Sequence, residues 1–218
     1  PTTWSLRAVW GTDSTHVFAA GDLATVLRWD GTRWEQLPVS DTTGMTVKTS
    51  GLFGIWGADK DDVWFAGADG VLLHWDGKQV ARFANGAQST LLRALWGTGP
   101  RSAYAVGAGG VMLRWDGTKW ADFPSMTTEY LTSIWGTSDN NIYVGAASGL
   151  IRRWNGTAWS IANNFNNYGI YSIWGTDAAN IFAVGDLLLT DPTRRDATKR
   201  QATFLKLNGT MFVDVDAA

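Results

Sequence analysis

The residues of this 218-residue chain that could do chemistry are few, since it has two histidines and no cysteine. Without cysteine there is no thiolate nucleophile, thiolate metal site or disulfide, and two histidines cannot by themselves build a histidine-rich metal site. Three neighbouring carboxylates, Asp59, Asp61 and Asp62, suggest calcium, but the segment lacks the glycine and glutamate spacing of an EF-hand loop. We therefore predict no metal site and no cofactor.

Two segments concentrate groups suited to recognition. Residues 163–169 bracket two aromatic rings with four asparagines, whose amides suit sugar hydroxyls while a ring stacks on the apolar face of a pyranose. Residues 186–202 carry four of the 18 basic residues and suit an acidic partner or an anionic glycan. The candidate ligand-binding residues are Asn163, Asn164, Asn166, Asn167, Tyr168, Arg194, Arg195 and Lys199. Ordinary polar or solvated loops are the alternative for both segments.

These segments interrupt a repeat. Trp-Gly pairs begin at Trp10, Trp56, Trp96, Trp135 and Trp174, spaced by 46, 40, 39 and 39 residues. A second marker follows each pair, in the forms RWDGTRW, HWDGKQV, RWDGTKW, RWNGTAW and KLNGTMF. The chain therefore consists of five copies of one unit.

Each copy has the pattern of four short strands. In the first copy they are residues 6–10, 17–20, 25–29 and 33–39, separated by turn-forming residues. The WDGT tetrad suits a tight hairpin, with Gly31 at positive φ and Asp30 accepting from the amides of the turn. About 40 residues in four antiparallel strands, repeated around an axis, are typical of a β-propeller blade. We predict an all-β, five-bladed β-propeller with four antiparallel strands per blade, one domain over residues 1–218 with repeats near 4–39, 50–85, 90–124, 129–162 and 168–216.

Positions that correspond to one another in the five copies, which we call columns, predict how the blades pack. We expect the columns of Leu6 and Ala8 to share one face of the blade and the column of Val9 to lie on the other, because side chains alternate along a strand. Most of the 14 tryptophans should fill the wedge between blades. Apolar packing of the fifth blade on the first should hold the ring.

The stretch LRAVWGTDSTHVFAAGDLATVLRWDGTRW resembles the Asp-box, or bacterial neuraminidase repeat, and the repeats of photosystem II stability-factor-like propellers. The similarity extends over all five units, but arginine, histidine or lysine replaces the serine that opens an Asp-box, two places before the aspartate. Families with such repeats include sialidases, other glycosidases, lectins and assembly factors. The resemblance therefore implies a propeller without choosing an activity.

A residue class shared by every copy serves the scaffold, so departures from the repeat are the candidates for function. His74 shares its column with arginines and a lysine, and His16 lies in a polar column at the entry to the second strand, so neither histidine stands out from its column and a structural or surface role is favoured for both. One further column is basic and has two interpretations. Its side-chain stems pack on aromatic rings and make cation–π contacts, or its cations form a repeated anion site between blades. Its members are Arg28, His74, Arg114, Arg153 and Lys206.

Several function classes are disfavoured. A net charge of −2 argues against nucleic acid, and no apolar run approaches the roughly 18 residues of a membrane span. Glycoside hydrolysis needs two carboxylates at a fixed separation, whereas the first-strand columns contain no Asp or Glu. We therefore expect no catalytic residue and no enzyme activity, with a glycoside hydrolase as the least favoured reading.

The remaining departures are three connections, residues 40–51, 163–169 and 186–202, which should emerge on one face. We predict a non-enzymatic binding module that recognises a glycan, in the manner of a lectin, or a protein through this loop-bearing face. The alternative is a structural or assembly docking platform within a larger surface or secreted protein. The missing cysteine, the polar turns and the resemblance together lead us to expect a bacterial, extracellular or cell-surface location.

Overall fold

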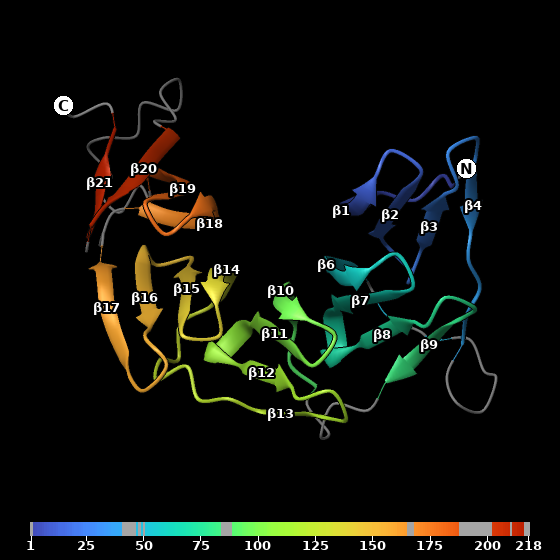
Figure 1. Cartoon of the computed structure of the whole chain (residues 1–218), viewed down its shortest axis with the longest axis horizontal. Coiled ribbons are helices and arrows are strands. Elements are labelled where there is room, and N and C mark those ends of the chain that lie inside the picture. The colour runs from blue at the N-terminus through green and yellow to red at the C-terminus, as the bar shows by residue number, and fades with distance from the viewer. Residues whose placement is uncertain are drawn as a thin grey trace. The chain divides into compact units, whose positions relative to one another are not determined.

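The computed structural model is built almost entirely of β-strands and describes residues 2–40, 47, 49, 51–83, 89–164, 168–187, 202–209 and 211–215 (Figure 1). Within these residues the strands form five sheets, and within each sheet the four antiparallel strands follow one another in chain order as hydrogen-bonded neighbours. Four sheets contain four antiparallel strands each, and the second sheet along the chain adds a short parallel strand to its own four. The predicted all-β architecture of five four-stranded units is confirmed. No helix in the described part of the chain is long and apolar enough to cross a membrane.

The chain divides into two compact units, and the first comprises residues 1–107 and 111–124. Its first sheet contains β1 (Leu6–Asp13), β2 (His16–Gly21), β3 (Val26–Trp29) and β4 (Trp34–Gln36). The second contains β5 (Val39–Ser40), β6 (Leu52–Asp59), β7 (Asp62–Gly67), β8 (Leu72–Trp75) and β9 (Val80–Phe83), with the short helix η1 (Ala68–Gly70). The third contains β10 (Leu92–Gly99), β11 (Ser102–Gly107), β12 (Met112–Trp115) and β13 (Trp120–Asp122).

The second unit comprises residues 108–110 and 125–218. It begins with the short helix η2 (Ala108–Gly110). Its first sheet, which is the fourth along the chain, contains β14 (Leu131–Ser138), β15 (Asn141–Ala146), β16 (Leu150–Trp154) and β17 (Trp159–Asn164). The fifth contains β18 (Tyr168–Asp177), β19 (Asn180–Leu187), β20 (Ala202–Asn208) and β21 (Met211–Asp214). That all five sheets make a single domain stays a prediction.

The fourth strand of the first copy is shorter than the sequence predicts. It ends at Gln36, and Val39 and Ser40 pair in parallel with Val80 and Ala81 at the edge of the second sheet. Pro38 explains the break, because proline has no N–H to donate to a sheet ladder. The chain therefore leaves its own sheet there and adds a fifth strand to the next one.

Every first strand carries a β-bulge near its start. In β6 the register shifts between Leu52 and Gly54, so one extra residue interrupts the alternation. Leu52 and Ile55 consequently share the cluster packed between the first and second sheets, whereas the ideal Cβ position of Gly54 lies 3.1 Å from Ala94 Cα on the third. The expectation that the Leu6 column shares a face with the Ala8 column is therefore wrong, because the bulge moves it to the face of the Val9 column.

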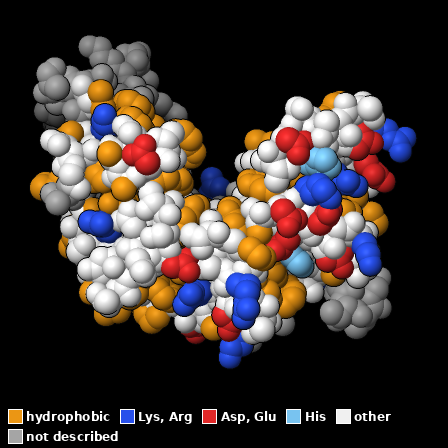
Figure 2. Space-filling model, viewed as in Figure 1, with side chains coloured by type: hydrophobic (Ala, Val, Ile, Leu, Met, Phe, Trp, Pro, Cys, Tyr) orange, Lys and Arg blue, Asp and Glu red, His pale blue; other side chains and the backbone are white. Residues whose placement is uncertain are grey.

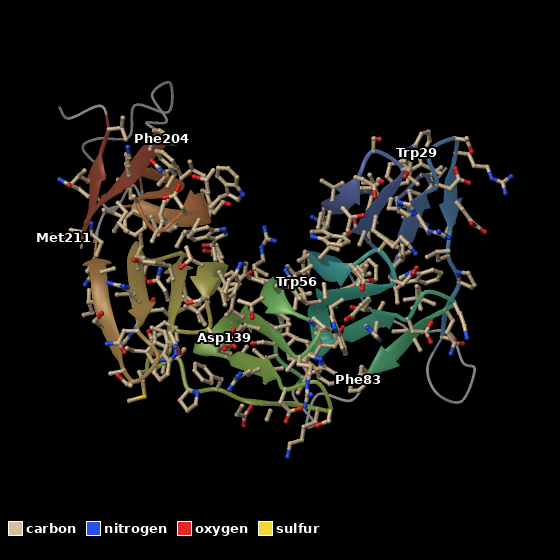
Figure 3. All side chains as sticks on the ribbon, viewed as in Figure 1. Trp29, Trp56, Phe83, Asp139, Phe204 and Met211 are labelled. Atoms are coloured by element: carbon tan, nitrogen blue, oxygen red, sulfur yellow. The ribbon has the colours of Figure 1, made fainter. Side chains whose placement is uncertain are left out.

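Within each unit, neighbouring sheets meet where the tryptophan of one Trp-Gly pair lies on the glycine of the next. A Cβ placed on Gly57 would lie 2.5 Å from the Trp10 ring, and one on Gly97 would lie 2.8 Å from the ring of Trp56, which Figure 3 labels on β6. In the second unit, a Cβ on Gly175 would lie 2.8 Å from the Trp135 ring. The glycine is required because any side chain there would push two close-packed sheets apart.

The expected core role of tryptophan holds for part of the set. Four rings are buried: Trp64, Trp75, Trp115 and Trp120. The indole N–H groups of Trp29, Trp75 and Trp115 each donate to a backbone carbonyl fifteen residues earlier, at 3.0–3.2 Å. Such bonds satisfy the polar edge of a buried ring. Trp4, Trp34 and Trp174 are exposed.

The tight hairpins follow the sequence prediction. Gly31 has a φ of 96°, and Asp116 Oδ1 accepts from the backbone N–H and hydroxyl of Thr118 and from the N–H of Lys119, at 2.7–2.9 Å. Asn155 Oδ1 accepts the same three bonds from the residues that follow it, at 2.8–2.9 Å. One acceptor oxygen therefore organises the turn whether or not the side chain is charged.

The Asp116 turn predicts a specific acid sensitivity. The Thr118 hydroxyl, then the backbone N–H groups of Lys119 and Thr118, lower the pKa of Asp116 from 3.8 to about 2. A carboxyl whose folded pKa is depressed contributes stability above its unfolded pKa, and that stability is lost as the pH falls through the folded pKa. Asp116→Asn should therefore lose less stability than the wild type between about pH 5 and pH 2 in urea-unfolding curves. Asn155→Asp is the matched reverse and should lose more; identical pH profiles for all three proteins would contradict the prediction.

The tryptophan–glycine contact predicts a large effect from one methyl group. Gly57→Ala should lower the free energy of unfolding by about 1–3 kcal/mol, because its Cβ meets both the Trp10 ring and the Asp62 carbonyl. Gly99→Ala is the control, since a Cβ there has no atom within 4 Å and should change stability by less than about 0.5 kcal/mol. Chemical denaturation of both variants checks the difference, and equal effects would rule out the packing argument.

Candidate functional site

The bulge position of the first strand varies in chemical class from copy to copy. Its occupants, in chain order, are Arg7, Phe53, Arg93, Thr132 and Tyr171. A bulge releases one side chain from the alternation of the strand and aims it independently of the packed faces. This row therefore departs from the repeat at a point where the scaffold does not dictate the residue.

Three residues of the row come together in the first unit, from strands β1, β6 and β10. The guanidinium carbon of Arg7 lies 5.5 Å from the centre of the Phe53 ring, and that of Arg93 lies 5.7 Å from it. Arg93 Nη1 also donates to the Phe53 carbonyl at 3.3 Å. Both cations are within the range of cation–π attraction to the one ring. We call Arg7, Asp22, Phe53 and Arg93 the arginine–phenylalanine cluster.

Asp22 neutralises one of the two cations. Its carboxylate accepts from Arg7 Nε at 2.5 Å and from Nη2 at 3.0 Å, a bidentate pair that raises the pKa of Arg7. Within the described residues, Arg93 has no acidic partner. Two guanidiniums and one carboxylate leave the cluster with one positive charge, and Arg93 retains donors beyond its bond to Phe53. The cluster can therefore take an anionic group beside an aromatic ring.

The turn that follows Asp22 has an unusual backbone. Leu23 and Ala24 have φ values of 55° and 57°, in the left-handed region that costs a non-glycine residue about 1–2 kcal/mol. The equivalent turn of the third sheet has two glycines, Gly109 and Gly110, at positive φ. Leu23 is also 55% exposed. An exposed apolar side chain is therefore held at a strained position directly after the carboxylate of the cluster.

The second unit uses its bulge residues differently. The buried Thr132 hydroxyl has the carbonyls of Ile170 and Gly145 within hydrogen-bond distance and shares its one proton between them. The Tyr171 hydroxyl donates to Asp186 Oδ1 at 2.7 Å. These contacts tie strands together and carry no net positive charge. Among the five bulge residues, the two that are charged, Arg7 and Arg93, lie in the first unit.

The predicted asparagine site is described only in part. Asn163 Nδ2 donates to the Phe212 carbonyl at 2.5 Å, a contact between β17 and β21, and Asn164 is exposed at the end of β17. The remaining candidates lie outside the described residues: Asn166, Asn167, the side chain of Tyr168, Arg194, Arg195 and Lys199. Asn163 therefore has a structural contact, and ligand binding by this set stays a prediction.

The basic column packs on aromatic rings, as one of its two interpretations predicts. Arg28, Arg114, Arg153 and Lys206 place their cations 5.5–5.8 Å from the centres of Trp75, Tyr104, Tyr143 and Phe182. His74 stacks on Trp64 with ring centres 4.2 Å apart, and its Nε2 lies 2.7 Å from Asp62 Oδ1. The column serves the scaffold.

The other polar candidates have local partners. His16 Nδ1 lies 3.0 Å from the carboxylate of Asp13. Asp59 Oδ1 accepts from the N–H of Asp61 at 2.7 Å, as expected for a turn-capping carboxylate. In the portion of the chain that the structure describes, no three acidic or histidine side chains converge as a metal site would require.

Sequence reasoning missed the arginine–phenylalanine cluster, although a signal for it was present. The bulge position of the first strand holds a cation, an aromatic ring or a hydroxyl, whereas the positions on either side of it hold similar residues in every copy. What the sequence does not show is that Arg7 and Arg93, which are 86 positions apart, contact the same ring. That proximity depends on the stacking of three sheets.

Comparison with known proteins gives structural relatives only. No family model matches the chain, and no curated protein matches it either. The solved structure titled "YCF48 bound to D1 peptide" superposes with a TM-score of 0.67 at 14% identity, covering 98% of this chain and 67% of that one. The computationally designed protein Ika8 gives a TM-score of 0.66 at 16% identity, covering 97% of this chain and 62% of that one. The chain thus spans about two thirds of the length of these relatives, and its fold is the five-bladed β-propeller that the repeat predicts.

The strained turn predicts a gain of stability on mutation. Leu23→Gly should raise the free energy of unfolding by about 1 kcal/mol, because glycine adopts positive φ without the steric cost and the leucine is largely exposed. Urea denaturation measures the change. Arg33→Gly, at an exposed position with ordinary φ, is the control and should lower stability. A loss of stability in Leu23→Gly would contradict the strain argument.

Proposed function

We propose that the chain is a non-enzymatic binding module for a protein partner, and that it recognises a peptide segment through the arginine–phenylalanine cluster. The preferred segment would carry a carboxylate next to an apolar side chain. The observation that carries this proposal is Arg93, a cation stacked on the Phe53 ring and lacking an acidic partner among the described residues.

The chemistry of the cluster fits such a segment. Arg93 would donate to the carboxylate, while the Arg7–Asp22 pair fixes the far side of the site and keeps its charge at one positive unit. Phe53, which is half-buried, and the exposed Leu23 supply apolar surface beside the charge. Mixed aromatic and arginine surfaces of this kind are typical of the centres of protein interfaces.

Two further observations support a protein partner. One structural relative is titled as bound to a peptide, and the repeat resembles those of stability-factor-like propellers. Arg7, Phe53 and Arg93 lie on the first strands of three neighbouring sheets, and strands give a rigid support for recognition. Glycan recognition through residues 163–168, and a docking role within a larger protein, are the competing hypotheses.

The proposal is tested with a peptide array in which acidic and apolar residues are paired in both orders, probed with the labelled chain. For the peptides that bind, Arg93→Ala should weaken affinity at least about tenfold, since a hydrogen bond to a charged group contributes about 1.5–3 kcal/mol. Raising the salt concentration should also weaken binding, because salt screens the attraction between Arg93 and the carboxylate of the peptide. Arg33→Ala removes an equally charged, exposed side chain that lies on the hairpin between β3 and β4, and it is the matched control.

The outcomes separate the hypotheses. Binding that survives Arg93→Ala and Phe53→Ala, or an array without binders, would reject the proposed site. Sugar binding on a glycan array that is lost in Tyr168→Ala would favour the lectin hypothesis instead. Circular dichroism of each variant verifies that the fold is intact.

A further inference from the structure

Two hairpins of the repeat hold an asparagine where the other three hold aspartate, and the one between β16 and β17 is described throughout. Its asparagine, Asn155, is exposed, and Gly156 follows it with the same φ of 96° as Gly117 in the third sheet. The equivalent aspartates are Asp30, Asp76 and Asp116. The asparagine therefore lies in a turn whose backbone is built by aspartate elsewhere in the chain.

The side-chain amide of Asn155 is hydrogen-bonded at its oxygen. Oδ1 accepts from the backbone N–H and the hydroxyl of Thr157, each at 2.9 Å, and from the N–H of Ala158 at 2.8 Å. Within the part of the chain that the structure describes, Asn155 Nδ2 and the backbone N–H of Gly156 have no hydrogen-bond partner. Three donors thus hold the oxygen, while the two nitrogens are open to water.

This arrangement suits the conversion of asparagine to aspartate through a cyclic imide. The Gly156 nitrogen can attack Asn155 Cγ and close a five-membered ring, because glycine has no Cβ to hinder the approach. Its proton passes to hydroxide, and negative charge develops on Oδ1, at which the three donors are already directed. The bond from Cγ to Nδ2 then breaks, and Nδ2 takes a proton from water and leaves as ammonia.

We propose that Asn155 is a site of spontaneous deamidation and that the folded turn supplies the donors that stabilise its transition state. Water completes the reaction by adding to Cγ of the ring. The bond between Cγ and the Gly156 nitrogen breaks, the nitrogen regains a proton, and the side chain becomes a carboxylate. Opening of the ring at its other carbonyl carbon gives isoaspartate, which places one extra carbon in the main chain.

The fold accommodates the aspartate product. Asp116 Oδ1 accepts the same three bonds in the third sheet, from Thr118 and Lys119. Isoaspartate would instead lengthen the main chain between Trp154 and Trp159, which are paired across the hairpin. Figure 2 shows the surface over β16 and β17 mainly in white, the colour of uncharged polar side chains and backbone. The reaction therefore brings a negative charge to a largely uncharged part of the surface while the turn is kept.

Incubation of the folded chain at mildly alkaline pH, followed by peptide mapping with tandem mass spectrometry, tests the proposal. Asn155 should gain the mass of deamidation at a rate that rises with pH, because hydroxide removes the Gly156 proton. Asn164 is also exposed but precedes phenylalanine, so it should stay intact and is the matched control. The map separates Asn155 from Asn85 and Asn208, which also precede glycine.

Two variants test whether the turn takes part. Thr157→Val removes the hydroxyl that donates to Oδ1 and should slow the reaction of the folded chain about two- to tenfold, the factor that corresponds to one ordinary hydrogen bond. Thr157→Ser keeps a hydroxyl and should react as the wild type does. In concentrated urea the turn is lost, so all three chains should react at the same rate.

Three results would each overturn the proposal. The first is an Asn155 that stays intact in the folded wild type. The second is an equal rate for the folded wild type and folded Thr157→Val. The third is a difference between these two chains that persists in urea, because it would then come from the local sequence and not from the turn.

Discussion

The contact between a tryptophan ring and the glycine of the next sheet is the constraint on which the packing of this protein depends. Because the ring of Trp10 occupies the space that a side chain at Gly57 would need, the distance between sheets is set by aromatic thickness and bare backbone. The same constraint holds at Trp135 and Gly175 in the second unit. Repetition of one contact explains why the flanking columns are uniform in size and polarity.

The residue at the β-bulge of each first strand takes no part in the tryptophan–glycine contact. An extra residue at the start of each first strand returns Leu52 and Ile55 to the packed face and leaves Phe53 outside the alternation. The five first strands carry arginine, phenylalanine, threonine or tyrosine at that position. The chemical class of the residue at this position therefore varies while the tryptophan–glycine contact recurs.

The cluster around Phe53 shows how local features combine in such a position. Arg7 is oriented by the two oxygens of Asp22, and Asp22 is followed by a turn whose backbone is strained at Leu23. Arg93 reaches the same ring from a third strand. These groups lie outside the tryptophan–glycine contacts, so the cluster and those contacts use different residues of one unit.

The sequence by itself determined the repeat, most of the strands and the turn chemistry of Asp116, because each depends on neighbours within one copy. It left two interpretations of the basic column open, and the structure decided between them. The tertiary structure decided which face each residue occupies and which residues from different copies meet. The bulge changes the face of Leu52 through hydrogen-bond register, which residue types do not encode. The meeting of Arg7 and Arg93 at one ring requires three stacked sheets, so no pattern within a single copy could reveal it.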